Sequence, residues 1–168
     1  MSQPKHPSFS VIKAPSALPR PSSSESKTLF LSGRISPSAH AQTWQEELIS
    51  RLQHLPLTIL NPLRSDWDST WEAKTTFAPF VEQVNWELDG LQAADIVVAY
   101  FAPDSDCPIT LLEFGLTVAE RPRKVVCWCP EDYSKRGNVQ IVCARKSVKL
   151  CETVDEVVAV VCKSVERV

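Results

Sequence analysis

From Thr28 onward, short runs of β-branched and aromatic residues alternate with segments in which apolar residues recur at helical spacing. This alternation is typical of βαβ units, in which helices connect the strands of a parallel sheet. The pattern therefore predicts one α/β domain over residues 28–168, doubly wound, with helices on both faces of a five-stranded parallel sheet. The predicted strands cover residues 28–32, 58–61, 95–101, 124–129 and 148–151.

Four of the connecting segments are predicted to be helices. Thr43 and Glu46 form a capping box before the first helix, and Thr153 and Glu156 form one before the last. Pro108 marks the start of the third. The apolar stripes are Trp44, Leu48, Leu52 and Leu55; Phe77, Phe80, Val81, Val84, Leu88 and Leu91; Ile109, Leu112, Leu116 and Ala119; and Val154, Val157, Val158, Val161 and Val165.

Residues 1–27 differ in composition from the rest of the chain, with five prolines and many serines. Such a composition buries too little apolar surface to fix a fold of its own. We therefore expect a flexible N-terminal arm. Its segment Val11 to Pro15 (VIKAP) is apolar enough to pack onto the domain.

Composition and charge exclude several classes of function. The chain is 43% hydrophobic and 23% charged, as expected of a globular protein with its own core. Its formal net charge is -2 without a basic stripe, so we expect no nucleic acid polymer as partner. An apolar run of about 18 residues, long enough to span a membrane, is absent, and so is the apolar core of a secretory signal. We expect a cytoplasmic protein without a membrane partner.

The six cysteines do not indicate a metal site. Cys127 and Cys129 lie two apart in an apolar run, on one face of a predicted strand, with no histidine or cysteine pair nearby at zinc spacing. Core packing is the better interpretation. We expect reduced thiols, no metal and no organic cofactor.

Glu113 is the first candidate for chemistry, because ligands of open parallel sheets bind beyond the carboxyl ends of the strands. It lies five residues after Pro108, where a helix dipole favours a charged carboxylate that is ready to act as a nucleophile. An acid near a helix start is also ordinary dipole complementation, so position alone leaves both readings open. Gly115 suggests that something approaches the backbone of this helix closely.

Glu87 is the second informative acid, since it lies at the edge of the apolar stripe of its helix. It is either a buried acid satisfied by a neighbour, or a group that orients a hydroxyl or a partner acid in the site. Two carboxylates are the general solution for retaining glycosyl chemistry.

Two aspartates and a tryptophan are further candidates. Asp104 and Asp106 precede the third predicted helix and are candidates for protonating a leaving base, although Asp106 is equally an N-cap residue. Trp67 lies in an Asp-rich loop, where it can stack on a base or pack into a small satellite cluster.

Five segments in this order resemble the nucleoside 2-deoxyribosyltransferase-like family: LFLSGRI, NPLRSDWDSTWE, QVNWELDGLQAADIVVAYFAP, DCPITLLEFG and CPEDYSKRGNVQIVC. The similarity covers nearly all of residues 28–151. It implies a flavodoxin-like sheet and a glutamate nucleophile at Glu113. It also implies a covalent 2-deoxyribosyl-enzyme intermediate that is passed to another base or to water.

The resemblance also implies roles for other residues. Glu87 matches an acid that orients the nucleophile and the sugar, and Asn138 matches an asparagine donated to a neighbouring subunit's site, which implies a homo-oligomer. Cys107 is a departure, because classical members carry there an aspartate that handles protonation of the base, and Asp106 is displaced by one. Transfer to a second base, hydrolysis and simple binding therefore remain open.

The residues expected to contact the ligand come from the same loops. Arg34 and Arg64 are the cations closest to the predicted cleft, and each is a candidate for a 5′-phosphate. Phe101 and Trp67 are expected to form apolar walls that limit the entry of water. The expected substrate-binding residues are Gly33, Arg34, Asn61, Arg64, Asp66, Trp67, Phe101 and Asn138.

The predicted function is therefore cleavage or transfer of the N-glycosidic bond of a small (2-deoxy)nucleoside or nucleotide through Glu113. Two alternatives come from other classes: a nucleotide-binding module without turnover, and a glutamate-dependent hydrolase of a dinucleotide such as NAD.

Overall fold

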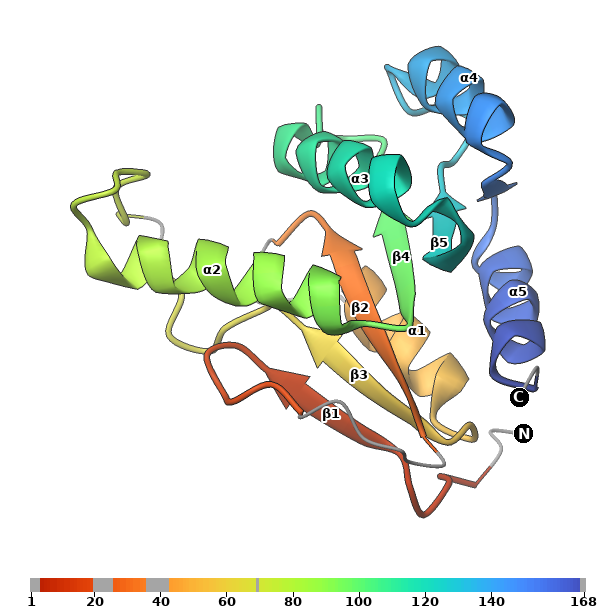
Figure 1. Cartoon of the computed structure of the whole chain (residues 1–168), viewed down its shortest axis with the longest axis horizontal. Coiled ribbons are helices and arrows are strands. Elements are labelled where there is room, and N and C mark those ends of the chain that lie inside the picture. The colour runs from red at the N-terminus through yellow and green to blue at the C-terminus, as the bar shows by residue number, and fades with distance from the viewer. Residues whose placement is uncertain (1–3, 20–25, 36–42, 69, 167–168) are drawn as a thin grey trace.

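The centre of the molecule is a parallel β-sheet, seen in Figure 1 with its helices around it. The computed structural model describes residues 4–19, 26–35, 43–68 and 70–166. Within them the sheet has six strands in the order β1-β3-β2-β4-β5-β6, all parallel. The strands are β1 (Ser10–Lys13), β2 (Lys27–Gly33), β3 (Leu57–Asn61), β4 (Ile96–Tyr100), β5 (Val125–Trp128) and β6 (Lys149–Cys151).

The five predicted strands all form, and their spatial order is 2-1-3-4-5 in the numbering of the prediction, which is the flavodoxin-like order. The sheet nevertheless has six strands and not five, because β1 adds an edge strand beside β3. In that pair Val11 lies opposite Ile59. β1 belongs to the segment for which the composition predicted a flexible arm.

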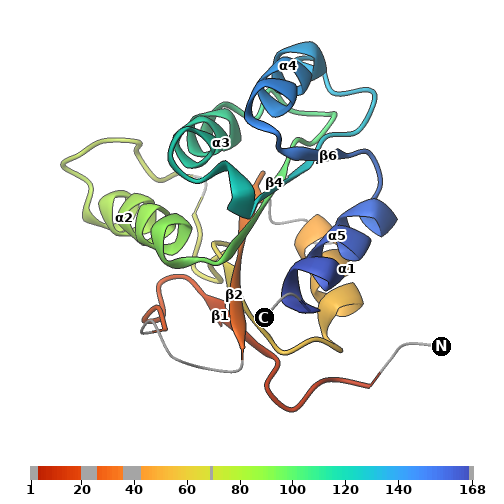
Figure 2. The same ribbon diagram turned by 45° about the vertical axis from the view of Figure 1, so that its right-hand side comes forward.

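Helices cover both faces of the sheet. Figure 2 shows α1 and α5 on one side of it, and α2 and α3 on the other. The helices in the described part of the chain are α1 (Trp44–Leu52), α2 (Ala78–Ala93), α3 (Pro108–Glu120), α4 (Arg136–Lys146) and α5 (Val154–Glu166), with a short 3₁₀ turn at Pro122–Lys124. None of them is long and apolar enough to cross a membrane.

α4 was not among the four predicted helices. Only two of its side chains, Val139 and Cys143, are buried, so its sequence carries too weak an apolar period to indicate a helix. Both of them pack with Cys127 and Cys129 in the core beneath α3 and α4. All six cysteines are free thiols, and the residues described here include no group of three or more His, Cys, Asp or Glu side chains placed to hold a metal ion.

Successive side chains of each central strand enter different cores, because they point to opposite faces of the sheet. Leu29 and Leu31 of β2 pack in the core under α1 and α5, whereas Phe30 packs in the core under α2. Because both faces are covered, the central strands read as nearly continuous apolar runs.

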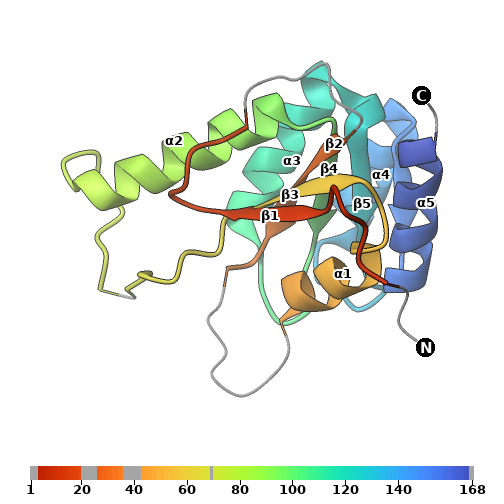
Figure 3. The same ribbon diagram turned by 90° about the horizontal axis from the view of Figure 1, so that it is seen from below.

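The N-terminal segment is fastened to this domain at several points, and Figure 3 shows it running beside β3 and on toward α2. Phe9 is buried in the core under α1 and α5. Leu18 packs against the core under α2, and the backbone oxygen of Ser16 accepts a hydrogen bond of 2.7 Å from Trp86 Nε1. A few well-spaced apolar side chains therefore fix a segment whose average composition is that of a flexible linker.

α3 turns a different face to the core from the one that its apolar stripe indicated. Ile109, Leu112 and Leu116 are 60%, 58% and 47% exposed. The buried face instead carries Glu113, together with Thr110, Phe114, Thr117 and Val118. Because apolar residues occur around the whole helix, their period alone could not select the buried side. The observed orientation places the Glu113 carboxyl inside the molecule.

Candidate active site

A cavity of about 440 Å³ opens between α2, α3 and the loops that follow β2 and β3. It lies beyond the carboxyl ends of the strands, where ligands of such sheets bind. Its wall is mostly apolar, with Ile35, Pro62, Trp67, Phe80, Val84, Leu88, Ile109 and Leu112. The polar side chains on the wall are Arg34, Gln83, Glu87, Ser105, Cys107, Thr110 and Glu113.

Glu113 is held at this cavity by the end of β2. Its side chain is 7% exposed, and its Oε2 accepts a hydrogen bond of 2.5 Å from Ser32 Oγ. Burial raises the pKa of Glu113 to about 7; the Ser32 hydrogen bond opposes this shift and the nearby charge of Glu87 adds to it.

A helix dipole was expected to keep Glu113 ionised at neutral pH, but burial raises its pKa to about 7, where the carboxyl is only partly ionised. The dipole acts most strongly within the first turn of a helix. α3 begins at Pro108, so Glu113 already lies beyond that turn. Desolvation of the carboxylate outweighs any remaining effect.

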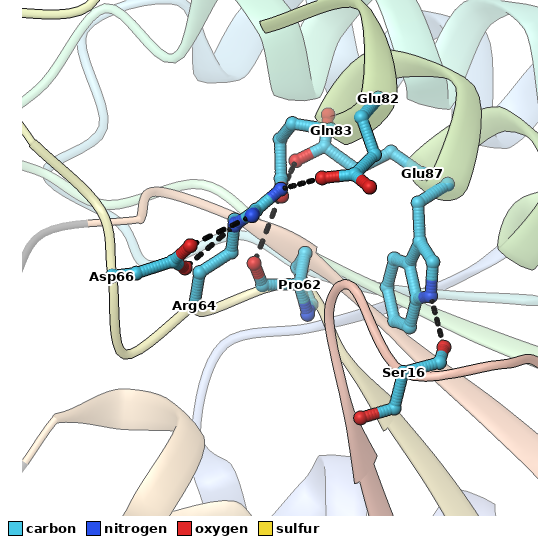
Figure 4. Close-up of polar contacts among 8 residues, drawn as sticks. Ser16, Pro62, Arg64, Asp66, Glu82, Gln83 and Glu87 are labelled. Carbon is cyan, nitrogen blue, oxygen red and sulfur yellow. Dashed lines mark hydrogen bonds and ion pairs between the residues drawn. The ribbon is translucent and has the colours of Figure 1, made fainter. Parts of the chain in front are cut away.

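Glu87 reaches the same cavity from α2. It is buried, and its Oε1 accepts a hydrogen bond of 2.8 Å from Gln83 Nε2. Burial raises the pKa of Glu87, and the Gln83 hydrogen bond opposes the rise. Gln83 Nε2 also donates to the backbone oxygen of Pro62 at 2.9 Å, and Figure 4 shows these residues together. Glu87 is thus a buried acid satisfied by a neighbour, and it shares a cavity with Glu113; its orienting role stays a prediction.

Asp104 and Asp106 are exposed and do not line the cavity. Asp104 pairs with Arg34, and Asp106 pairs with Lys135. Hydrogen bonds from these two cations are the main reason that both carboxyl pKa values are lowered. Ionised acids have no proton to give, so this environment argues against both as general acids.

Asp106 is not the N-cap of α3 either. The N-cap is Cys107, whose backbone is left-handed with φ 47° and ψ 48°, and its side chain makes no capping hydrogen bond. Non-glycine residues rarely adopt this conformation. At Cys107 the chain turns sharply into α3, and Cys107 lines the same cavity as Glu113.

The end of β2 also positions Arg34. Its backbone oxygen accepts hydrogen bonds from Trp44 Nε1 at 3.0 Å and Gln45 Nε2 at 3.1 Å, while its guanidinium pairs with Asp104 at the cavity. A Cβ at Gly33 would lie only 2.5 Å from Trp44, so glycine allows β2 and α1 to approach this closely.

Arg64 does not line the cavity. Its Nε and Nη2 each donate to Asp66 at 2.8 Å, and its Nη1 donates to Glu82 at 2.8 Å (Figure 4). Its guanidinium also lies over the ring of Trp71, 5.0 Å from the ring centroid. The hydrogen bonds that Arg64 donates to Asp66 are the largest cause of its raised pKa. Because all these donors are engaged, Arg64 braces the loop after β3 and is not free to meet a phosphate.

Of the remaining residues predicted to contact the ligand, some line the cavity and others do not. Trp67 lines the cavity and packs in a small cluster with Trp71, with 5.1 Å between their ring centroids; stacking on a base stays a prediction. Asn61 accepts from the backbone nitrogen of Leu63 within the loop, and Phe101 lies in the core against Phe114. Asn138 is exposed on α4, and nothing lies within 4 Å of a Cβ built at Gly115, so no described segment approaches that glycine.

The predicted site did not include Ser32, which donates a hydrogen bond to Glu113, or Gln83 and Thr110, which line the cavity. Ser32 is buried on β2, where its hydroxyl needs a partner. Gln83 and Thr110 lie four and three residues before Glu87 and Glu113 on their helices, so each shares a face with a carboxyl. A search for buried polar residues at this spacing would have found the last two.

The family model for proteins described as "Nucleoside 2-deoxyribosyltransferase like" matches residues 26–133, more than half of the chain. The chain belongs to this family. The matched part of this deoxyribosyltransferase-like protein contains Ser32, Glu87 and Glu113, and it ends before α4.

The other comparisons concern the fold. A crystal structure described as a conserved protein from Enterococcus faecalis V583 is similar to this chain with a TM-score of 0.56. The similarity covers 84% of this chain and 98% of that one at 11% sequence identity, so it supports the fold alone. No curated protein matches the chain.

The raised pKa of Glu113 predicts how the stability of this deoxyribosyltransferase-like protein depends on pH. The folded protein binds more protons at Glu113 than the unfolded chain does between the ordinary pKa of 4.5 and about 7. The free energy of unfolding should therefore fall as the pH rises through this interval, by about 3 kcal/mol from this group. Urea unfolding of Glu113→Gln between pH 4 and 8 should show that this fall is lost.

Glu120→Gln is the matched control, because Glu120 is exposed on the same helix. It should keep the pH dependence of the wild-type protein. The same pH dependence in wild type and Glu113→Gln would show that Glu113 is not the group that titrates.

Proposed function

We propose that this protein breaks the N-glycosidic bond of a (2-deoxy)nucleoside or nucleotide through a glycosyl ester on Glu113. The observation that carries the proposal is the pair of buried carboxyls, Glu113 and Glu87, on the wall of one apolar cavity. Retaining glycosyl chemistry needs two such groups, one to attack the anomeric carbon and one to handle protons. Membership of the deoxyribosyltransferase-like family supports the same reaction.

In the first step, an oxygen of ionised Glu113 attacks C1′ of the sugar. A C1′–O bond forms and the C1′–N bond to the base breaks, so the electron pair of that bond leaves with the base. The base nitrogen takes up a proton. Ser32 holds the attacking carboxylate with its hydroxyl, which leaves the other carboxylate oxygen available.

We propose that Glu87 gives this proton: of the two forms in which the Glu113–Glu87 pair carries one proton, the reactive form has the proton on Glu87. Burial raises its pKa, whereas Asp104 and Asp106 have lowered pKa values and lie off the cavity wall. A general acid is most effective when its pKa lies near the working pH. Glu87 therefore takes the role that the sequence analysis gave to the two aspartates.

In the second step, water or another base attacks C1′ and transfers a proton to Glu87. The ester bond breaks, and its electron pair returns to Glu113 as a carboxylate. The apolar walls, including Trp67 and Phe80, restrict the entry of water and so influence which acceptor reacts. Arg34 is the one cation among the described residues on the wall, and it is the candidate contact for a 5′-phosphate.

The reaction predicts both a product and an adduct. Purified protein is incubated with deoxyinosine alone, with deoxyinosine plus adenine, and with NAD, and the bases released are followed by chromatography. We expect hypoxanthine in the first two incubations, and intact protein heavier by one deoxyribosyl group in mass spectrometry. Glu113→Gln should lower turnover at least about a thousandfold, because it removes the attacking group.

The three incubations separate the alternatives. Formation of deoxyadenosine in the incubation with deoxyinosine plus adenine shows transfer. Release of hypoxanthine there without deoxyadenosine shows hydrolysis. Release of nicotinamide from NAD without consumption of deoxyinosine would replace the proposal with the dinucleotide hydrolase. Binding of nucleosides without any product would replace the proposal with the nucleotide-binding module that lacks turnover.

Ser32→Ala tests how Glu113 is activated. The Ser32 hydrogen bond lowers the pKa of Glu113, so its removal should raise that pKa. The reactive pair keeps one proton for the base and loses it as the pH rises through the Glu113 pKa of about 7, so kcat/KM should fall there in the wild type. In Ser32→Ala this fall should occur at higher pH, and a rate profile from pH 5 to 9 measures the difference.

Thr110→Val is the matched control, because it removes another hydroxyl from the same cavity wall. It should leave the pH of the fall unchanged, whatever its effect on the rate. An unshifted profile in Ser32→Ala would contradict the role given to Ser32.

We also propose a homo-oligomer in which Asn138 of one copy completes the site of another. Asn138 is exposed on α4 and does not line the cavity of its own chain. Ile141 and Val142 of the same helix are 67% and 37% exposed, which suits a surface covered by a second copy. Light scattering of the purified protein should give a mass of at least two chains, and a monomer at micromolar concentration would contradict the proposal.

A further inference from the structure

One side chain on the cavity wall has a hydrogen-bonding atom without a partner. Gln83 is 3% exposed, and its Nε2 donates to both Pro62 O and Glu87 Oε1. Its Oε1 is enclosed and accepts no hydrogen bond. Buried acceptors are almost always paired in folded proteins, because an unpaired one has lost water without replacement.

The orientation of this amide follows from its surroundings. The backbone oxygen of Pro62 can only accept a hydrogen bond, so the nitrogen of Gln83 must face it. A flipped amide would bring two oxygen atoms together and lose this contact. The unpaired atom is therefore the oxygen, and it requires a donor.

The place of Gln83 indicates where such a donor comes from. Gln83 lies one turn before Glu87 on α2, and it lines the same cavity as Glu87 and Glu113. Oε1 itself is closed to water, so a donor that arrives from that cavity reaches it only with a shift of the surrounding side chains. Since Glu113 reacts at C1′ in the proposed function, the sugar is the part of the ligand that must lie between these carboxyls.

Resting on that proposed function, we propose that Gln83 is a substrate-recognition residue whose Oε1 accepts a hydrogen bond from a hydroxyl group of the sugar. The same side chain holds Glu87 through Nε2, so recognition of the sugar and placement of the acid depend on one amide. A site with an enclosed, unpaired acceptor discriminates against a ligand that lacks the matching donor, because the acceptor then stays unsatisfied. Gln83 should therefore distinguish sugars by one hydroxyl.

The test is a double-mutant cycle between Gln83 and the sugar, with binding as the readout. Glu113→Gln prevents turnover and serves as the background, alone and combined with Gln83→Met, which has a similar length and no acceptor. Dissociation constants are measured by calorimetry for inosine and for its 2′-deoxy, 3′-deoxy and 5′-deoxy analogues. Gln92→Met is the matched control, because Gln92 is exposed on the same helix and does not line this cavity.

We expect one analogue to bind about tenfold more weakly than inosine when Gln83 is present, and less than about twofold more weakly in Gln83→Met. The Gln92→Met control should keep the full tenfold difference. Equal ratios with and without Gln83 for all three analogues would overturn the assignment of Gln83 alone. Failure of all four nucleosides to bind the background protein would contradict the proposed function, and this inference with it.

A ligand-bound crystal structure of Glu113→Gln gives a second test that does not depend on the folding of the Gln83 variant. A sugar hydroxyl within about 3.2 Å of Gln83 Oε1 supports the proposal. A bound sugar with every hydroxyl farther than about 3.5 Å from that oxygen overturns it.

Discussion

The hydrogen bond between Ser32 and Glu113 is the contact on which the arrangement of the site depends. It joins the end of a central strand, β2, to the buried face of α3, and both side chains are enclosed. Keeping this carboxyl inside turns the apolar residues Ile109 and Leu112 outward, where they form part of the cavity rim instead of the core. The orientation of α3 therefore fixes both the position of the candidate nucleophile and the shape of the cavity in front of it.

Burial divides the acids around the cavity into two groups with different chemistry. Asp104 and Asp106 lie in water beside cations, so their pKa values are lowered and they remain charged. Glu87 and Glu113 lie inside an apolar wall, where removal from water raises both pKa values. Destabilisation of the charged form is a cost to the fold, and it is also what lets a carboxyl hold a proton near neutral pH. The residues that brace the loops, such as Arg64 with Asp66 and Glu82, lie outside this region and keep their charges paired.

The fold was largely predictable because its main signals are local. The five predicted strands are buried on both faces and so appear as apolar runs, and the capping boxes at Thr43 and Thr153 mark the starts of α1 and α5. The exceptions, β1 and α4, have few buried side chains and owe their structure to neighbours. β1 forms because β3 offers an unpaired edge, and α4 forms because Val139 and Cys143 fill the core beneath it.

The sequence by itself determined the α/β class and the family, and it indicated the two glutamates that the structure places on one cavity wall. Strand runs, helical periods and motif wording are properties of consecutive residues. Only the tertiary structure decided which side of α3 is buried, that Asp104 and Asp106 have cationic partners, and that Arg64 is engaged away from the cavity. It also brought in Ser32 and Gln83, whose partners lie on other elements or on the next turn of a helix. The physical reason is that burial and the protonation state of an acid depend on atoms distant in the chain, and these meet only when the sheet and its helices have packed.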